Sequence, residues 1–236
     1  MRPYRHIFFD LDHTLWDLRT NSRDMLAELY ADLDLAAAGV PDVTALIEVY
    51  EEINGALWKD YGLGRIPKEV LRVLRFRNTL GQFGVNDADL ARRMAREYLE
   101  RCPHRTALNP GARETLAALL GRVKLHIITN GFREVQAIKL RASGIEAYFD
   151  LVLTSEEARA HKPDPRIFSH ALERVGAGAA ESLMVGDDAR NDVAGARGSG
   201  IDQVHYVPDG LHHGDTQATH RIDHLERLVS IVDAQG

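Results

Sequence analysis

The sequence contains one cysteine and has no long apolar run. Cys102 alone cannot form an internal disulfide, and it lacks the neighbouring cysteine and histidine ligands of a zinc finger. No stretch approaches the length of about 20 apolar residues that a membrane span requires. Too few apolar residues follow residues 1–5 for a secretory signal. We therefore expect a cytoplasmic protein that does not enter a membrane.

The sequence also lacks a dense run of basic residues. Its 29 lysines and arginines against 35 aspartates and glutamates give a net charge of −6. Such a chain is a poor partner for a nucleic-acid polymer or an anionic membrane, although it can still hold one small phosphate. With 236 residues, 44% of them hydrophobic and 27% charged, it has the composition of an ordinary globular protein. The length predicts one large domain, or a core with a smaller domain inserted.

Two carboxylates directly follow a short apolar run near the start of the chain. Residues 7–9 (Ile-Phe-Phe) are too few for a helix and are typical of a buried strand in a parallel sheet. Ligands bind at the carboxyl ends of such strands, where Asp10 and Asp12 can point the same way. Paired carboxylates without an adjacent cation are costly, which indicates a divalent metal. The alternative is a strand that ends in an ordinary polar turn.

Residues 16–104 have apolar residues at helical spacing. The pattern predicts four helices, which contain in turn Met25, Leu46, Val70 and Leu90. Asn86 is predicted to cap the fourth helix, and Asn109 with Pro110 to begin a further helix over 110–121. A simple crossover between two strands does not need so much helix. We therefore predict a helical cap domain inserted beside the active site.

Strands and helices alternate in the rest of the chain. Strands are predicted at 123–128, 151–153, 182–185 and 203–207, the last being the final strand. The alternation predicts an α/β fold in which residues 1–15 and 105–236 form a doubly wound, Rossmann-like parallel sheet. We interpret His212 and His213, in a Gly/Asp loop, as a solvated turn.

Further polar residues follow the predicted strands. Taken singly, each has an ordinary explanation as a helix cap or a solvent-exposed side chain. In order along the chain they are Asp10-Leu-Asp12-His-Thr14, Thr129, Lys162-Pro163, and Gly186-Asp187-Asp188-Ala-Arg-Asn191-Asp192. With this order of motifs and the helical insert, the chain resembles the haloacid dehalogenase superfamily over its whole length. The resemblance implies phosphoryl chemistry, for which positioning and charge neutralisation matter most.

The resemblance implies a role for each aspartate. Asp10 is implied to be the nucleophile that forms an aspartyl-phosphate, and Asp12 the general acid and then the general base. The implied cofactor is Mg²⁺, which suits an oxygen-only site. Its implied ligands are the Asp10 side chain, the Asp12 backbone carbonyl and the Asp187 side chain. Asp192 is implied to hold metal-bound water or the motif lysine, and Asp188 is not favoured as a direct ligand.

The remaining motif residues are expected to bind phosphate. Thr129 offers a hydroxyl, and the amides of Asn130 and Gly131 lie where a helix is predicted to start, which favours an anion. Lys162 adds a compact positive charge that offsets the carboxylates and stabilises the transition state.

Other activities use related residues. A dehalogenase expels halide, which needs no proton, so Asp12 argues against that reaction. A phosphonatase would need a cap lysine such as Lys59 or Lys68, and lysines on helix surfaces are common. A sugar-phosphate phosphatase or a phosphomutase uses the same catalytic residues and remains open. A non-catalytic protein that binds a phosphorylated ligand is the alternative from another class, although it would not require Asp12.

The cap sequence indicates a substrate class. Residues 57–67, Arg75-Phe76, 129–132 and 155–157 are similar to the bacterial pyrimidine nucleotidases. The resemblance implies a nucleoside 5′-monophosphate, preferably a pyrimidine one, as substrate. We expect a monomer or a homodimer, a choice that the sequence does not decide. Trp58 or Tyr61 could stack on a base, and Arg75 could meet a ribose or base oxygen. The alternative is that these side chains pack the cap.

Overall fold

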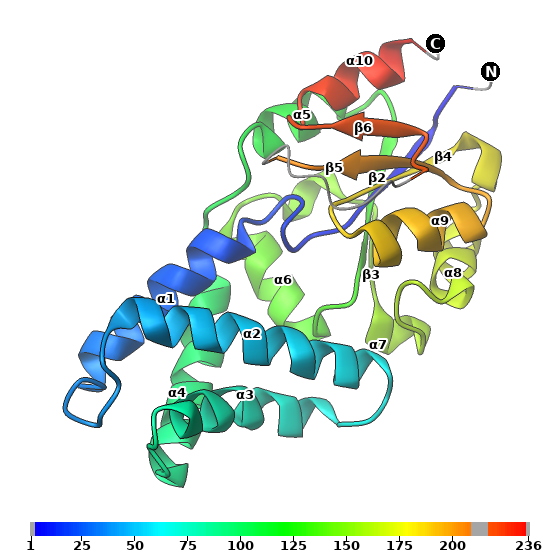
Figure 1. The fold of residues 1–236 in the computed structure, drawn as a ribbon. Coiled ribbons are helices and arrows are strands. Elements are labelled where there is room, and N and C mark those ends of the chain that lie inside the picture. Colours follow the sequence, from blue (N-terminus) through cyan, green and yellow to red (C-terminus); the bar gives the residue numbers. More distant parts are fainter. Residues whose placement is uncertain (1–2, 209–216, 235–236) are drawn as a thin grey trace. The chain divides into compact units, whose positions relative to one another are not determined.

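The computed structural model describes residues 3–208 and 217–234, so the interpreted turn at His212 and His213 lies outside the described residues. The chain divides into two units, Met1–Leu18 with Thr106–Gly236, and Arg19–Arg105. The first unit contains a sheet with flanking helices, and the second is built from helices (Figure 1). Across the described ranges, none of the helices combines the length and the apolar character of a membrane span.

The sheet of the first unit has six parallel strands among the described residues, in the order β3-β2-β1-β4-β5-β6. They are β1 (His6–Phe9), β2 (Lys124–Thr129), β3 (Leu151–Thr154), β4 (Ser182–Gly186), β5 (Asp202–Tyr206) and β6 (His220–Ile222). The chain runs outward from β1 to β3 and then crosses to β4, which confirms the predicted doubly wound α/β fold. The prediction that residues 203–207 form the final strand was wrong, because the short and largely polar β6 follows it.

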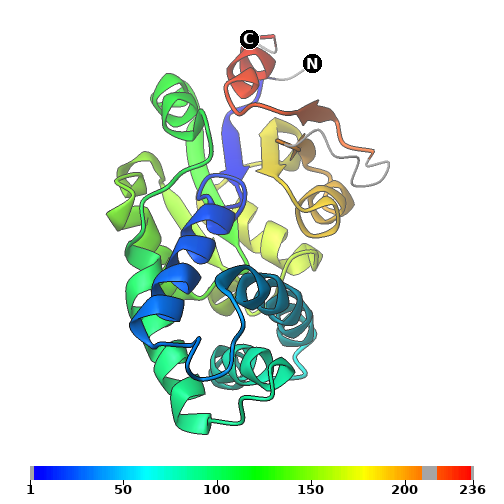
Figure 2. The same cartoon turned by 60° about the vertical axis from the view of Figure 1, so that its left-hand side comes forward.

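Helices cover both faces of this sheet. They are α5 (Ala112–Leu119), α6 (Arg133–Ala142), α7 (Ser155–Ala158), α8 (Pro165–Val175), α9 (Gly195–Gly198) and α10 (Arg227–Asp233), with the short turns η2 (Glu146–Tyr148), η3 (Ala179–Glu181) and η4 (Ala189–Ala194). Right-handed crossovers place α5 and α6 on one face and α8 and α9 on the other, as Figures 1 and 2 show. Phe8, Met184 and Phe168 belong to the buried apolar cluster that includes residues of α8.

The reversal of strand order lies beside β1. Phe9 pairs with Ile127 of β2 on one side and with Val185 of β4 on the other. The residue after Phe9 is therefore flanked by the carboxyl ends of both neighbouring strands. In open α/β sheets this crevice is the usual ligand site.

Four helices and a short turn make up most of the second unit. They are α1 (Leu18–Asp32), α2 (Val43–Gly62), α3 (Lys68–Gln82), α4 (Ala88–Arg101) and η1 (Cys102–His104). Tyr98 of α4 donates a hydrogen bond of 2.7 Å to Ser22 of α1, which links the two ends of this unit. The predicted cap at Asn86 was wrong by one residue. Asp87 accepts hydrogen bonds from the amides of Asp89 and Leu90, because its carboxylate is the one placed over the first turn of α4.

A histidine pair lies on β1 and β2, with His126 buried and His6 half-buried. The rings of His6 and His126 are stacked with centroids 5.3 Å apart, and Nδ1 of His6 is 3.0 Å from Nε2 of His126. Burial is the main cause that lowers the pKa of His126 to about 4, and the charges of His6 and Lys124 lower it further against the opposing effect of Asp150.

This histidine is expected to make stability depend on pH. The unfolded chain binds a proton at His126 below about pH 6.5, whereas the folded chain does so only near pH 4, so stability is lost as pH falls through this window. Between pH 7 and pH 5 we expect a loss of about 2 kcal/mol from this group. Urea unfolding at both pH values checks this. Because Asp10, Asp187 and Asp192 titrate in the same window, the wild type is compared with His126→Gln, which should lose about 2 kcal/mol less stability between the two pH values. Equal changes in the two proteins would contradict the assignment.

Candidate active site

The loop after β1 carries Asp10 at the centre of the site. The Asp10 amide donates to Val185 O at 2.9 Å, which extends the pairing with β4 by one residue. Leu11 is fully buried. The loop then turns at His13, whose φ of 67° lies in the left-handed region, before it reaches the buried Thr14. This turn keeps Asp10, Asp12 and Thr14 in one compact segment.

Asn109 holds this turn from another part of the chain. Its Nδ2 donates to His13 O at 2.6 Å and to Thr14 O at 2.9 Å, and its amide donates to Leu15 O at 2.9 Å. The predicted helix start at Asn109 and Pro110 was wrong, because α5 begins at Ala112. The asparagine side chain satisfies loop carbonyls instead of helix amides, which sequence spacing alone does not reveal.

Three carboxylates from three segments form an acidic cluster. Asp10 follows β1, Asp187 follows β4 and Asp192 lies in η4, and each offers an oxygen within 4.8 Å of the others. Burial is the main cause that raises the pKa of Asp10 and Asp187 to about 7 and of Asp192 to about 6, and repulsion within the cluster adds to it. The cluster is therefore costly without a bound cation. Hard carboxylate oxygens of this kind fit Mg²⁺.

Lys162 supplies a positive charge that contacts two carboxylates of the acidic cluster. Its Nζ donates to Asp10 Oδ1 and Asp192 Oδ1, both at 2.6 Å, and to Ile128 O at 2.8 Å. Burial alone would lower the pKa of Lys162, but the two carboxylates raise it, so the ammonium stays charged. When all three carboxylates are ionised, the cluster with this lysine keeps a net charge of −2, which a divalent ion matches.

Asp192 and Asp188 have different surroundings. Asp192 Oδ2 accepts from the Asp188 amide at 3.1 Å, so both of its oxygens are engaged within the protein. A Cβ on Gly186 would lie 2.2 Å from this Asp192 oxygen, which is why only glycine fits there. The Asp188 carboxylate caps η4, where it accepts from the amides of Arg190 and Asn191 at 2.8 Å. This capping leaves Asp188 poorly placed as a metal ligand.

Thr14 and Asp187 join the first and last motifs. The Thr14 hydroxyl donates to Asp187 Oδ1 at 2.9 Å and accepts from the Asp187 amide at 3.1 Å. His205 Nε2 lies 3.0 Å from Asp187 O. These contacts fix the loop after β4 against the loop after β1.

Thr129 is the last residue of β2, and Asn130 and Gly131 follow it. Thr129 is buried, and its hydroxyl oxygen accepts from the Gly131 amide at 3.1 Å. The Asn130 side chain exchanges two hydrogen bonds with the backbone of Lys162, at 2.8 Å from its amide and 3.0 Å to its carbonyl. Asn130 therefore ties the lysine segment to the end of β2. Helix α6 begins at Arg133, two residues after Gly131.

The Asp12 side chain points toward α6 and is not part of the acidic cluster. It accepts from Lys139 Nζ at 2.5 Å and from Gln136 Nε2 at 2.8 Å. Burial alone would raise the pKa of Asp12, but the charge and hydrogen bond of Lys139, with the hydrogen bond of Gln136, outweigh it and the pKa is lowered. The sequence analysis did not identify Gln136 and Lys139. Their signal was two polar residues, spaced i and i+3, on the buried face of α6.

The residues predicted to contact substrate lie in the helical unit. Trp58 and Tyr61 of α2 meet edge to face, with ring centroids 5.6 Å apart. Arg75 of α3 is buried, and its guanidinium lies 4.7 Å from the ring centroid of Tyr98 and 5.1 Å from that of Phe76. Its Nε is buried and has no hydrogen-bond partner among residues 3–208 and 217–234. The structure thus places Arg75 inside an aromatic cluster of its own unit.

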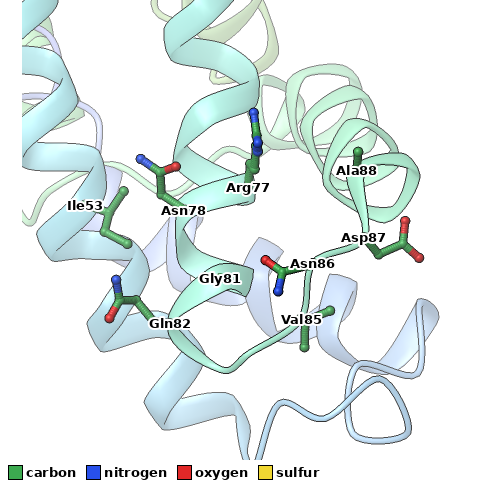
Figure 3. A pocket seen from close by; sticks show the side chains of 9 residues that line it. All are labelled: Ile53, Arg77, Asn78, Gly81, Gln82, Val85, Asn86, Asp87 and Ala88. Atoms are coloured by element: carbon green, nitrogen blue, oxygen red, sulfur yellow. The ribbon is translucent and has the colours of Figure 1, made fainter.

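The same unit contains a hollow of about 410 Å³ (Figure 3). It is lined by Ile53 of α2, by Asn78 and Gln82 of α3, and by Asn86 and Asp87 before α4. None of the predicted site residues lines it. Its polar lining contains no cluster of groups suited to catalysis.

Comparison with known proteins supports the family that the order of the motifs indicated. A family described as haloacid dehalogenase-like hydrolase matches residues 4–200. The pyrimidine 5′-nucleotidase PynA of Streptococcus pneumoniae is 31% identical over 234 residues, 98% of this chain and 95% of that protein. The pyrimidine 5′-nucleotidase YjjG of Escherichia coli is 34% identical over 196 residues, 83% of this chain and 82% of that protein. The crystal structure of the HAD-hydrolase YfnB from Bacillus subtilis bound to magnesium has a TM-score of 0.88 and 26% identity, with 98% of this chain and 100% of that chain covered.

Proposed function

The chain belongs to the haloacid dehalogenase-like hydrolase family, and from this premise we propose that it is a Mg²⁺-dependent phosphatase of nucleoside 5′-monophosphates, preferably pyrimidine ones. The observation that carries the proposal is the arrangement around Asp10. One of its oxygens is held by Lys162, and two further carboxylates lie within 4.8 Å. Two relatives named pyrimidine 5′-nucleotidases, each covering more than four fifths of this chain, support the substrate class.

In the first step Asp10 attacks phosphorus. Lys162 holds Oδ1, and among the described residues no donor contacts Oδ2, which leaves that oxygen available as the nucleophile. The bond from phosphorus to the ester oxygen breaks as the bond to Asp10 forms. Asp12 gives its proton to the departing alkoxide, and the product on the enzyme is an aspartyl-phosphate. The Thr129 hydroxyl and the Asn130 amide donate to the phosphoryl oxygens, and the Lys162 ammonium stabilises them through its charge. The Gly131 amide supports this site through its hydrogen bond to Thr129 Oγ1.

In the second step water hydrolyses the aspartyl-phosphate. Asp12, now a carboxylate, takes a proton from the attacking water. The bond between phosphorus and Asp10 breaks, inorganic phosphate leaves, and Asp10 returns to its starting form. Lys139 and Gln136 lower the pKa of Asp12, so they favour the carboxylate that this step requires and disfavour the acid that the first step uses.

The carboxylates of Asp10 and Asp187 and the backbone carbonyl of Asp12 would hold Mg²⁺. When bound, the ion neutralises charge on the phosphoryl group. Asp192 holds Lys162 in this proposal, because one of its oxygens accepts from the lysine and the other from a backbone amide.

The helical unit acts as the cap that selects the leaving group. Trp58 and Tyr61 offer aromatic faces for a base. The Arg75 guanidinium is buried beside Tyr98 and Phe76, so it meets a nucleoside only after side chains of this cluster shift, and its Nε has no hydrogen-bond partner among the described residues. These three residues are the proposed contacts for the nucleoside.

A substrate panel tests the proposal. Release of phosphate from dUMP and dTMP is expected to exceed that from a hexose phosphate or phosphoglycolate by about tenfold or more in kcat/KM, because the cap must recognise base and sugar. The measurement is inorganic phosphate with Mg²⁺ and again with excess EDTA, which should abolish it. A clear preference for a sugar phosphate would contradict the nucleotidase assignment and leave the phosphatase assignment intact.

Phosphate-release assays also distinguish the proposed phosphatase from two alternatives, a non-catalytic binding protein and a phosphomutase. A protein that only binds a phosphorylated ligand would release no nitrophenol from p-nitrophenyl phosphate, with or without Mg²⁺. A phosphomutase would convert its sugar phosphate to an isomer without net release of phosphate. Either result would overturn the proposal.

A further inference from the structure

One buried carboxamide contacts two groups of the site at once. Gln136 of α6 is fully buried, and its Nε2 lies 2.8 Å from Thr129 Oγ1 and 2.8 Å from Asp12 Oδ2. Both oxygens are acceptors for this one NH₂ group, which has two hydrogens to give. The distance between the phosphate-binding hydroxyl and the acid/base carboxylate is therefore set by a single side chain.

This contact determines which way the Thr129 hydroxyl points. Its oxygen accepts from the amide of Gly131 and from Gln136, which uses both of its lone pairs. No acceptor for the hydroxyl hydrogen lies within hydrogen-bond reach in the described part of the chain. The hydrogen is therefore free to be donated to a phosphoryl oxygen, with no competing partner inside the protein.

Lys139 holds the other oxygen of Asp12. It lies three residues after Gln136 on the same face of α6, and its Nζ donates to Asp12 Oδ1 at 2.5 Å. The lysine is 6% exposed, and its Nζ lies 4.2 Å from the ring centroid of Trp16. Within residues 3–208 and 217–234, Asp12 is its only carboxylate partner. The two α6 side chains thus engage both oxygens of Asp12.

The orientation of the Gln136 amide is fixed by its neighbours. Turning it over would place Oε1 against the carboxylate of Asp12, oxygen against oxygen. In the orientation observed, Oε1 is buried and has no hydrogen-bond partner in the part of the chain that the structure describes. A buried polar atom without a partner is unfavourable, and a residue that served packing alone would not need one.

The loop before α6 is shaped around this glutamine. A Cβ on Gly131 would lie 2.2 Å from Gln136 Nε2 and 2.5 Å from Cδ, so any other residue at 131 would displace the carboxamide. The glycine therefore serves the Gln136 contact as well as the course of the loop.

We propose that Gln136 and Lys139 are positioning residues, which hold the Asp12 carboxylate at a fixed place relative to the donor hydroxyl of Thr129. The inference rests on the proposed phosphatase function, in which these two groups act in the same phosphoryl transfer. Gln136 serves both groups, whereas Lys139 serves Asp12 alone. The two residues should therefore give different signatures when they are replaced.

The test measures the rate of the first chemical step by rapid-quench kinetics and compares two substrates with different leaving groups. p-Nitrophenolate leaves without a proton, whereas the alkoxide of dUMP needs one from Asp12. Lys139→Met is expected to slow the first step with dUMP by about 30-fold or more, because the loss of a fixed place for the Asp12 carboxyl outweighs its easier protonation without the lysine. The burst of nitrophenol should slow by less than about threefold. Lys139→Arg should recover most of the dUMP rate. Gln136→Met should slow both substrates by about tenfold, because the Thr129 hydroxyl loses its fixed direction.

Lys124→Met is the matched control, since Lys124 is largely exposed and pairs with Asp150 at the opposite end of β2. It should leave both rates unchanged. Equal loss on both substrates for Lys139→Met, or wild-type rates for either α6 variant, would overturn the inference while the wild-type enzyme stays active. If the wild type itself releases no phosphate in Mg²⁺, the proposed function fails and this inference fails with it.

Discussion

Asp10→Asn is expected to reduce phosphate release by at least about a thousandfold, because an amide cannot form the aspartyl-phosphate. The fold should be retained. Asparagine has nearly the same shape, and the replaced carboxylate is one whose pKa is raised by burial and by Asp192, so its charge is unfavourable in the folded state. Lys162 keeps its contact with Asp192. Phosphate release and the thermal midpoint are the two measurements.

Asp150→Asn provides the control for this substitution. Its carboxylate is half exposed and pairs with Lys124 at the other end of the sheet, so activity should be unchanged. Phosphate release by Asp10→Asn within tenfold of the wild type would exclude Asp10 as the nucleophile. A collapsed circular dichroism spectrum would show that the loss of activity came from the fold.

Lys162→Met should weaken both activity and stability. The substitution leaves Asp10 and Asp192 buried without their shared counter-ion and removes the donor to Ile128 O. Removing one member of a buried ion pair typically costs about 3–5 kcal/mol, so we expect a loss near the lower value and at least about a hundredfold lower kcat. Chemical unfolding and steady-state kinetics at the same pH measure the two effects.

Lys124→Met again provides the control, because its ion pair is exposed and should contribute at most about 1 kcal/mol. Stability of Lys162→Met equal to that of the wild type would mean that the three carboxylates do not depend on this ammonium. Full activity would remove Lys162 from the phosphate site.

The central residues of the site could be predicted because of the geometry of parallel sheets. A short apolar run identifies each strand, and the carboxyl ends of β1, β2 and β4 must meet at one edge. Asp10 and Asp187 come directly after β1 and β4, and Thr129 is the last residue of β2, so their proximity follows from strand order. The order of motifs then identified the family, which the comparisons confirm.

The supporting residues could not be predicted in the same way. Asn109 satisfies the rule for a helix cap, yet its side chain binds carbonyls of a loop almost a hundred residues earlier. In the sequence, Gln136 and Lys139 look like ordinary surface residues of a helix, because nothing there shows that α6 packs against Asp12. Strand β6 is too short and polar to produce an alternating pattern. In each case the deciding partner is distant in sequence, whereas propensity rules describe only local preferences.

Gly131 and Gly186 have the same structural role in the site. Gly131 leaves room for Gln136, and Gly186 leaves room for Asp192, so each loop carries a gap that a side chain five or six residues downstream fills. Chimaeras between members of the family must therefore transplant each loop together with the turn of helix behind it. A graft that brings a larger residue at position 131 or 186 would displace Gln136 or Asp192. It would thereby lower activity although no residue that contacts the substrate had been replaced.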